Sequence, residues 1–174
     1  MKWIGLILLL LAVTTTTAWS ASSLPPKCET VPAKTYNAQV HVLKAISGKR
    51  PNFADRSVCA SKFYELRDKI KTARKRCLEK AHQSWASYYD PEGTAGKYRY
   101  DHPGVIGTAH KTLPLGSKRF FHLGRRTQRA RIIDRGPYVS GREWDFTVGL
   151  KNRLGAGDLA YVWSSLRNCW AVAR

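Results

Sequence analysis

Short apolar runs separated by turn residues fill the second half of this chain, and they constrain its fold more than any other feature. The runs at 117–123 and 127–134 are joined by Gly124-Arg125-Arg126, which predicts a β-hairpin. Further strands are expected at 85–89 and 159–164, and a short helix over 146–154 that ends at Gly155. Many short strands with Gly-rich connections predict a mainly β fold that closes into a small barrel.

Residues 1–20 have the features of a secretory signal peptide. Lys2 gives a positive start, 4–13 form an apolar core, and 18–20 offer small residues at the cleavage position. A membrane anchor is the alternative, but the apolar core is shorter than the ~20 residues that span a bilayer. No later segment is apolar enough to span. We therefore expect an exported protein, secreted or periplasmic, without a transmembrane segment.

The composition is strongly basic, with 30 Lys and Arg against 12 Asp and Glu and a net charge of +18. A charge this large favours anionic polymers as partners. Because the protein is expected to be exported, we expect no nucleic acid but peptidoglycan, another anionic cell-wall glycan, lipopolysaccharide or an acidic surface. The other interpretation is a self-repelling surface that keeps the protein soluble. The sequence leaves the oligomeric state open and indicates no cofactor.

An extension precedes the strands and contains the best helical pattern of the chain. A helix is expected over 55–83, because this stretch lacks Gly and Pro and repeats apolar residues every three or four positions. Asp55 is its expected N-cap. Its apolar stripe would pack on its own domain or, alternatively, lie on a membrane. The preceding residues, 21–52, are expected to form a tether with one possible strand at 38–46.

Four cysteines remain after removal of a signal peptide: Cys28, Cys59, Cys77 and Cys169. An even number in an exported small protein predicts two disulfides. The cysteine spacings do not match a zinc site, and no metal is expected. On one continuous helix Cys59 and Cys77 would lie ~27 Å apart, beyond the ~7 Å that a disulfide allows. Each should therefore pair with Cys28 or Cys169, and the sequence does not decide which.

Two longer motifs carry a resemblance to a known family. Residues 108–116 read Thr-Ala-His-Lys-Thr-Leu-Pro-Leu-Gly, and residues 134–145 read Asp-Arg-Gly-Pro-Tyr-Val-Ser-Gly-Arg-Glu-Trp-Asp. Three shorter pieces accompany them: Ser87-Tyr88-Tyr89, Thr94-Ala95-Gly96 and Tyr100-Asp101. Together they resemble the bacterial RlpA-like (rare lipoprotein A) family over residues 84–166. The resemblance implies a six-stranded double-psi β-barrel, here with an N-terminal α-helical extension.

Members of this family include lytic transglycosylases, so the resemblance implies cleavage of peptidoglycan glycan strands. The barrel is shared with expansins, which loosen polysaccharide without evident hydrolysis, and fold alone does not decide the activity. The alternative is a non-catalytic, expansin-like cell-wall polysaccharide-binding protein, and a barwin-like defence or interaction protein is a third class. The chain departs from the family at Lys97-Tyr98-Arg99, where the usual Glu is missing. The family's lipid anchor and C-terminal glycan-binding repeat are not expected.

Cleavage of a glycosidic bond needs an acid that protonates the leaving oxygen. A lytic transglycosylase can use one carboxyl group as acid and then base, because the sugar's own hydroxyl attacks. Asp134, at the end of a strand, is the expected acid/base, although it could instead cap the following turn. Asp101 is the second candidate, as partner carboxylate or substrate ligand, unless it only forms the turn at His102. His110 would bind substrate or orient Asp134, or be structural.

Six further residues are expected to contact substrate: Tyr88, Tyr89, Tyr100, Lys111, Arg135 and Tyr138. The tyrosines could stack on sugar faces or be half-buried strand residues. Asp145 is expected to hold a loop or to cap a helix that starts at Phe146, rather than to act in catalysis. The expected organisation is a signal peptide over 1–20, an extension over 21–83, a barrel over 84–166 and a tail over 167–174.

Overall fold

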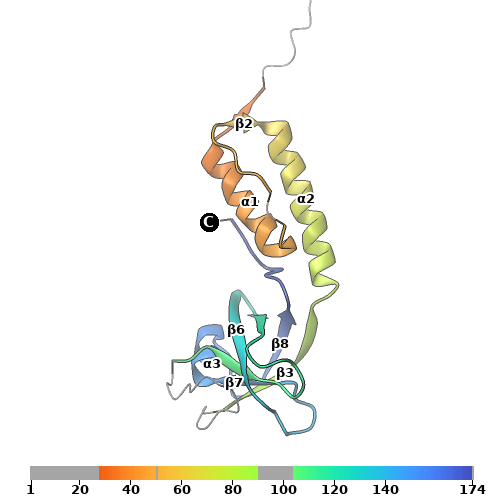
Figure 1. Ribbon diagram of the computed structural model, residues 1–174, viewed down its shortest axis with the longest axis vertical. Coiled ribbons are helices and arrows are strands. Elements are labelled where there is room, and N and C mark those ends of the chain that lie inside the picture. Colours follow the sequence, from red (N-terminus) through yellow and green to blue (C-terminus); the bar gives the residue numbers. More distant parts are fainter. Residues whose placement is uncertain (1–27, 50, 90–103, 174) are drawn as a thin grey trace, which may run out of the picture.

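A computed structural model describes residues 28–49, 51–89 and 104–173 of the chain. A pair of helices and a β-barrel are stacked along the long axis of the molecule (Figure 1). The C-terminal segment leaves the barrel and runs back beside the helices, so the two parts are connected twice (Figure 1). Among the helices that the structure describes, none is both long and apolar enough to cross a membrane.

Six strands close into a barrel in the order β3-β7-β4-β6-β5-β8. Their bounds are β3 (His82–Tyr89), β4 (Gly107–Ala109), β5 (Lys118–Leu123), β6 (Arg126–Asp134), β7 (Trp144–Thr147) and β8 (Ala160–Ser165). The pairs β3 with β7 and β4 with β6 are parallel, and the other four pairs are antiparallel. The predicted closed six-stranded barrel with a helical extension is confirmed, and its two parallel pairs agree with the double-psi topology. The predicted β5–β6 hairpin is also confirmed.

Large apolar side chains fill the barrel and alternate with outward-facing residues along the strands. Phe121, Ile132, Trp144 and Phe146 are each at most 1% exposed. The ring of Phe121 makes edge-to-face contacts with both Trp144 and Phe146. Burial of a Phe or Ile side chain stabilises a fold by roughly 1.5–3 kcal/mol. This core therefore decides which residues of each strand face outward.

Helix α3 (Val148–Leu154) follows β7 directly and adds two leucines to the barrel core. The sequence predicts its start at Phe146, but that residue belongs to β7 because its ring fills the core. The N-cap is Thr147, whose hydroxyl accepts a hydrogen bond from the Leu150 backbone N–H at 3.3 Å. The predicted cap role of Asp145 is wrong, because Asp145 lies inside β7. The predicted helix end is confirmed: Gly155 has a left-handed conformation with φ 66°.

Helix α1 (Ala33–Ser47) replaces the strand that the sequence predicts over 38–46, so that prediction is wrong. The β-branched residues Val40, Val42 and Ile46 favour a strand locally. All three are buried in one apolar cluster with side chains of the second helix. Packing between the two helices therefore outweighs the local preference, as tertiary contacts often do.

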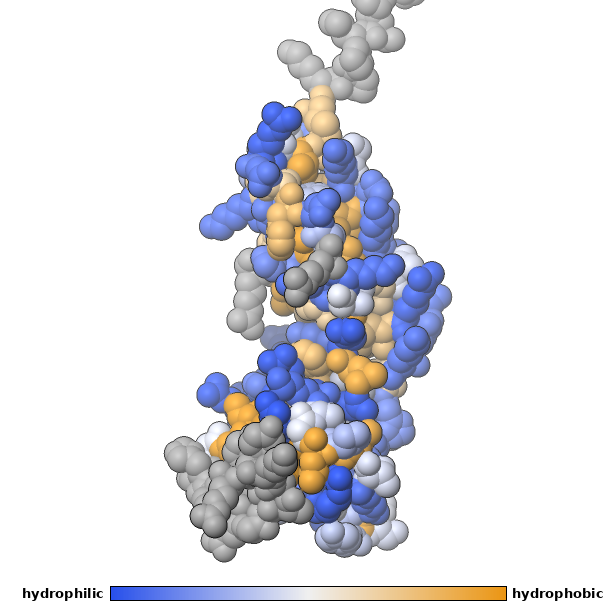
Figure 2. Space-filling view, in the orientation of Figure 1, coloured by the Kyte–Doolittle hydropathy of each residue, from blue (hydrophilic) through white to orange (hydrophobic). Residues whose placement is uncertain are grey.

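Helix α2 (Ala60–Leu78) is shorter at both ends than the helix predicted over 55–83. It begins after a short strand, so the prediction of Asp55 as its N-cap is wrong. Leu66 and Ile70 of its apolar stripe are buried against α1, which confirms the interpretation that the stripe packs on its own domain. On the face seen in Figure 2, hydrophilic residues lie on both sides of a band of hydrophobic ones in the helical part.

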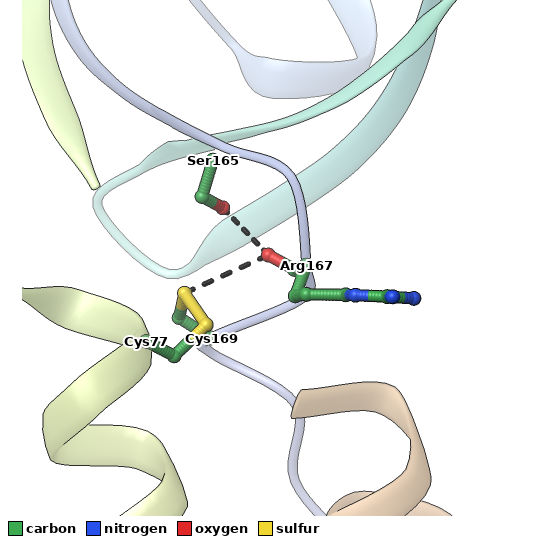
Figure 3. Close-up of a disulfide and its surroundings, with 4 residues drawn as sticks. All are labelled: Cys77, Ser165, Arg167 and Cys169. Atoms are coloured by element: carbon green, nitrogen blue, oxygen red, sulfur yellow. Dashed lines mark hydrogen bonds between the residues drawn. A yellow bond between two sulfur atoms is a disulfide. The ribbon is translucent and has the colours of Figure 1, made fainter. Parts of the chain in front are cut away.

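Two disulfides fix the helices at opposite ends. Cys28–Cys59 lies beside the two-stranded sheet of β1 (Thr30–Val31) and β2 (Val58–Cys59). Cys77–Cys169 joins the end of α2 to the segment that leaves the barrel (Figure 3). The predicted exclusion of a Cys59–Cys77 bond is confirmed, and the structure selects one of the two pairings that the sequence leaves open.

Replacing Cys77 and Cys169 together by Ser should lower the free energy of unfolding by about 2–5 kcal/mol, the usual loss for a native disulfide in a small domain. This disulfide closes a separation of 92 residues, and Cys169 is fully buried. Chemical denaturation of the oxidised proteins measures the difference. The matched control, Ser at Cys28 and Cys59, should lose less, since its separation is 31 residues. Equal losses would contradict this ranking.

Candidate functional site

Two carboxylates lie in one row across the outer surface of the barrel. Asp134 ends β6 and Asp145 lies in β7, and Ala109 of β4 between them is the register partner of both. Partners on neighbouring strands point to the same face of a sheet. Asp145 stands between the buried Trp144 and Phe146, so this row faces away from the core. The register therefore brings Asp134 and Asp145 onto one patch of surface.

Burial and a neighbouring carboxylate shape the protonation of Asp145. The pKa of Asp145 is raised mainly by burial; Ser87 and Arg142 oppose this, and nearby Asp134 adds to it. Burial also raises the pKa of Tyr89, and the charges of Asp134 and Asp145 raise it further. Asp145 therefore holds a proton more readily than an ordinary aspartate, as a general acid must.

Asp134 is half-buried at the end of β6 and is held by its own neighbours. Its Oδ1 accepts a hydrogen bond from the backbone N–H of Arg135 at 2.7 Å. Its backbone carbonyl accepts one from the backbone N–H of His110 at 3.1 Å. The predicted acid/base and the predicted histidine are therefore adjacent in space, and the start of the loop after β4 is tied to the end of β6.

His110 has a fixed tautomer and a fixed ring orientation. Its Nδ1 accepts hydrogen bonds from the backbone N–H groups of Thr112 at 3.1 Å and Leu113 at 3.0 Å. A nitrogen that accepts carries no proton, so in the neutral ring the proton is on Nε2. The ring packs on Trp144 with centroids 4.6 Å apart, and the side chain is 12% exposed. Burial lowers the pKa of His110, while Glu143 opposes this shift.

Glu143 joins this cluster, and sequence reasoning missed it. Its carboxylate lies 3.6 Å from Nε2 of His110 and 2.9 Å from Nε2 of His82. Its backbone N–H donates to the carbonyl of Trp85 at 3.0 Å, which holds the residue against β3. The signal that could have found it is its position in the 134–145 motif, two residues before Asp145. That spacing puts both side chains on the same outer face.

The guanidinium of Arg135 is hydrogen-bonded to the loop that follows β4. Its Nη1 donates to the backbone carbonyls of Leu113 at 2.8 Å and His110 at 3.3 Å. These bonds brace the turn whose N–H groups hold the His110 ring. Arg135 thus holds the loop that carries His110, and the substrate contact predicted for Arg135 stays a prediction.

The other predicted site residues that the structure describes have exposed or covered side chains. Tyr138 is 84% exposed and Lys111 is exposed, while the face of the Tyr88 ring is covered by the Lys151 ammonium at 3.5 Å from its centroid. Asp101 and Tyr100 lie outside the described residues. Within the three described segments, no group of His, Cys, Asp or Glu is arranged to hold a metal ion.

Exposed aromatic residues form a second surface feature, on β3 and β8. Trp85 and Tyr161 are register partners with ring centroids 5.0 Å apart, and they are 44% and 47% exposed. Trp163, two residues along β8 from Tyr161 and therefore on the same face, is 37% exposed. We call these three residues the aromatic strip. Because Trp85 is hydrogen-bonded to Glu143, the strip adjoins the cluster of Glu143 and His110.

Comparisons with known proteins find similarity in structure only. No family model matches the chain, and no curated protein matches its sequence. Among solved structures, part of the chain is similar to the Streptomyces papain inhibitor, with a TM-score of 0.41 and 14% sequence identity. The similarity covers 49% of this chain and 92% of that chain.

Replacing Glu143 by Gln should lower the pKa of His110 further, because the Glu143 carboxylate opposes the effect of burial. An NMR titration of the histidine ring protons measures the shift. The control, Glu65→Gln on an exposed turn of α2, should leave His110 unchanged. An unchanged His110 pKa in Glu143→Gln would contradict the electrostatic contact between the two residues.

Proposed function

We propose that this protein cleaves peptidoglycan glycan strands by a lytic transglycosylase reaction, with Asp134 as acid/base. Two lines support the proposal: the motifs at 108–116 and 134–145, which resemble the RlpA-like family, and the geometry around His110. The observation that carries it is that His110 contacts both carboxyl-bearing residues, the backbone of Asp134 and the side chain of Glu143. Enzymes that cleave glycosidic bonds usually use two carboxyl groups.

In the proposed reaction, the carboxyl group of Asp134 first protonates the leaving glycosidic oxygen. The bond from the anomeric carbon to that oxygen breaks, and positive charge develops on the sugar ring. The sugar's own 6-hydroxyl then attacks the anomeric carbon and forms a 1,6-anhydro ring. Its proton returns to the Asp134 carboxylate, so the acid is regenerated and no water is consumed. One carboxyl group therefore donates the proton to the leaving oxygen and accepts the proton of the attacking hydroxyl.

Glu143 supplies the second negative charge that the sequence lacks at 97–99. In the proposal its carboxylate, held by His82 and His110, stabilises the positive charge on the sugar ring. Asp145, whose pKa is raised mainly by burial, lies across Ala109 from Asp134. Asp101, Tyr89 and Tyr138 remain proposed substrate contacts.

The proposal also includes location and anchoring. Two disulfides indicate an oxidising compartment, and a signal peptide over 1–20 would deliver the chain there. The net charge, +18 for the whole chain and +17 without Lys2 of the signal peptide, would hold the protein on an anionic wall.

Asp134→Asn should lower the rate of strand cleavage by at least ~100-fold, the size of a general acid–base contribution. The mature protein is incubated with purified sacculi, with and without stem peptides, and soluble products are identified by mass spectrometry. Glu143→Gln should also slow the reaction, and Asp68→Asn on the exposed face of α2 is the matched control with unchanged rate. Anhydro-sugar ends that disappear in Asp134→Asn support the proposal. Reducing ends would indicate hydrolysis, and absence of any product would refute cleavage.

The aromatic strip favours a second candidate function, glycan binding without cleavage. Exposed Trp and Tyr rings offer flat apolar faces with polar edges, which suit sugar rings. In this candidate the protein resembles expansins, and the basic surface and the strip together hold polysaccharide.

Trp85→Ala with Tyr161→Ala should weaken binding to sacculi about tenfold, since ring stacking contributes ~1 kcal/mol or more. Co-sedimentation at fixed salt measures bound protein. Tyr64→Ala, which removes a tyrosine of α2 that is 57% exposed, is the control and should bind like wild type. Unchanged binding in the double variant would show that the strip does not contact the glycan.

A further inference from the structure

A pocket lies where both helices meet the chain that leaves the barrel. Its volume is about 590 Å³, within the range of roughly 300–1,000 Å³ that small-molecule sites occupy. Residues from α1, α2 and the segment after β8 line it. None of its lining residues belongs to the 108–116 or 134–145 motifs. The proposed glycan cleavage does not use this pocket.

The floor of the pocket is apolar. Leu43 and Ile46 of α1 face Ala73 and Cys77 of α2 across it. Leu166 stands at its edge with 69% of its surface exposed. On the face seen in Figure 2, hydrophobic residues are visible at the junction of helices and barrel, between hydrophilic ones. A concave apolar surface of this kind favours an apolar group over water.

The remaining wall of the pocket is cationic. Five basic residues line it: Lys49, Lys69, Arg76, Lys80 and Arg167. Among the lining residues that the structure describes, none is acidic. Of these five, only Lys69 forms an ion pair with a carboxylate in the described segments, with the exposed Glu65. An anion that binds the other four cations would therefore displace no carboxylate of the described segments.

The segment that carries Arg167 is held in place. The Ser165 hydroxyl donates to the Arg167 carbonyl at 2.6 Å, and the Cys77–Cys169 disulfide clamps the next residues to α2. Figure 3 shows the Arg167 side chain pointing away from this disulfide. It lies over Gly48, where a Cβ atom would come within 2.6 Å of the guanidinium carbon. Gly48 therefore permits the guanidinium to lie beside the end of α1.

We propose that this pocket binds a single-chain lipid with a phosphate headgroup. The acyl chain would lie on the floor formed by Leu43, Ile46 and Ala73, and the phosphate would meet Arg76 and Arg167. A free phosphate ion would leave the apolar floor in water, and a neutral lipid would leave the cationic wall without a partner. A multiply charged headgroup suits five cations better than a single carboxylate does.

Isothermal titration calorimetry with monododecyl phosphate, below its micelle concentration, tests the proposal on the mature, oxidised protein. The expected result is saturable binding with one site per chain. Inorganic phosphate has the anionic group without the alkyl chain, and dodecyltrimethylammonium has the alkyl chain with a cationic headgroup. Each should bind at least tenfold more weakly than monododecyl phosphate. Equal binding of inorganic phosphate would reduce the site to an anion site, and equal binding of the cationic amphiphile would reduce it to an apolar groove; either result overturns the proposal.

One variant changes the cationic wall of the pocket and a second changes its apolar edge. Arg76→Glu and Leu166→Asp change exposed side chains, so the fold should persist, and each should weaken monododecyl phosphate binding at least tenfold. Lys62→Glu is the matched control, because it makes the same charge change on an exposed face of α2 outside the pocket. Circular dichroism confirms folding. Equal weakening by Lys62→Glu would show that overall charge binds the lipid, and full binding by both pocket variants would place the lipid elsewhere.

Discussion

The position of β4 between β6 and β7 determines the arrangement of the proposed active site. This strand has only three residues, and side-chain hydroxyls reinforce its short ladders. Thr108 Oγ1 donates to the carbonyl of Asp145 at 3.0 Å, and Thr147 Oγ1 donates to the carbonyl of Val105 at 2.6 Å and accepts from the Gly107 N–H at 3.2 Å. Both threonines are fully buried, where such bonds are costly to lose. Because β4 is parallel to β6 and antiparallel to β7, its residue Ala109 lies between the two carboxylates at the ends of the 134–145 motif, Asp134 and Asp145.

Local patterns predicted the strands β3, β5, β6 and β8 and a small barrel, because turn residues separate these strands. The closed six-stranded barrel was expected from the family resemblance, since β4 and β7 have only three and four residues and show no strand pattern of their own. The β5–β6 hairpin and the end of α3 at Gly155 needed no long-range information. Helix α1 did need it: its β-branched residues favour a strand, and only contact with α2 makes the helix more stable. Geometry predicted that Cys59 and Cys77 stay apart, but the choice between the two remaining pairings depended on where the C-terminal segment returns.

The candidate site was predictable to the extent that it lies within motifs. Asp134 and His110 were identified because each belongs to one of the two motifs and stands at the edge of an expected strand, and the structure joins their backbones by a hydrogen bond. Glu143 was missed because its histidine partners come from β3 and from the loop after β4, and no local pattern links these positions. The aromatic strip was missed for a similar reason, since it forms only when β3 and β8 pair.

The Cys77–Cys169 disulfide affects how the barrel withstands cleavage by proteases. It encloses every strand of the barrel and α3 within one covalent ring. A single cut in any barrel loop would therefore open the ring without releasing a fragment, and the barrel could keep its strands together. Loss of a piece would require either a second cut or reduction of the disulfide. In an oxidising compartment, where the disulfide persists, the two pieces of a chain cut once would stay covalently joined.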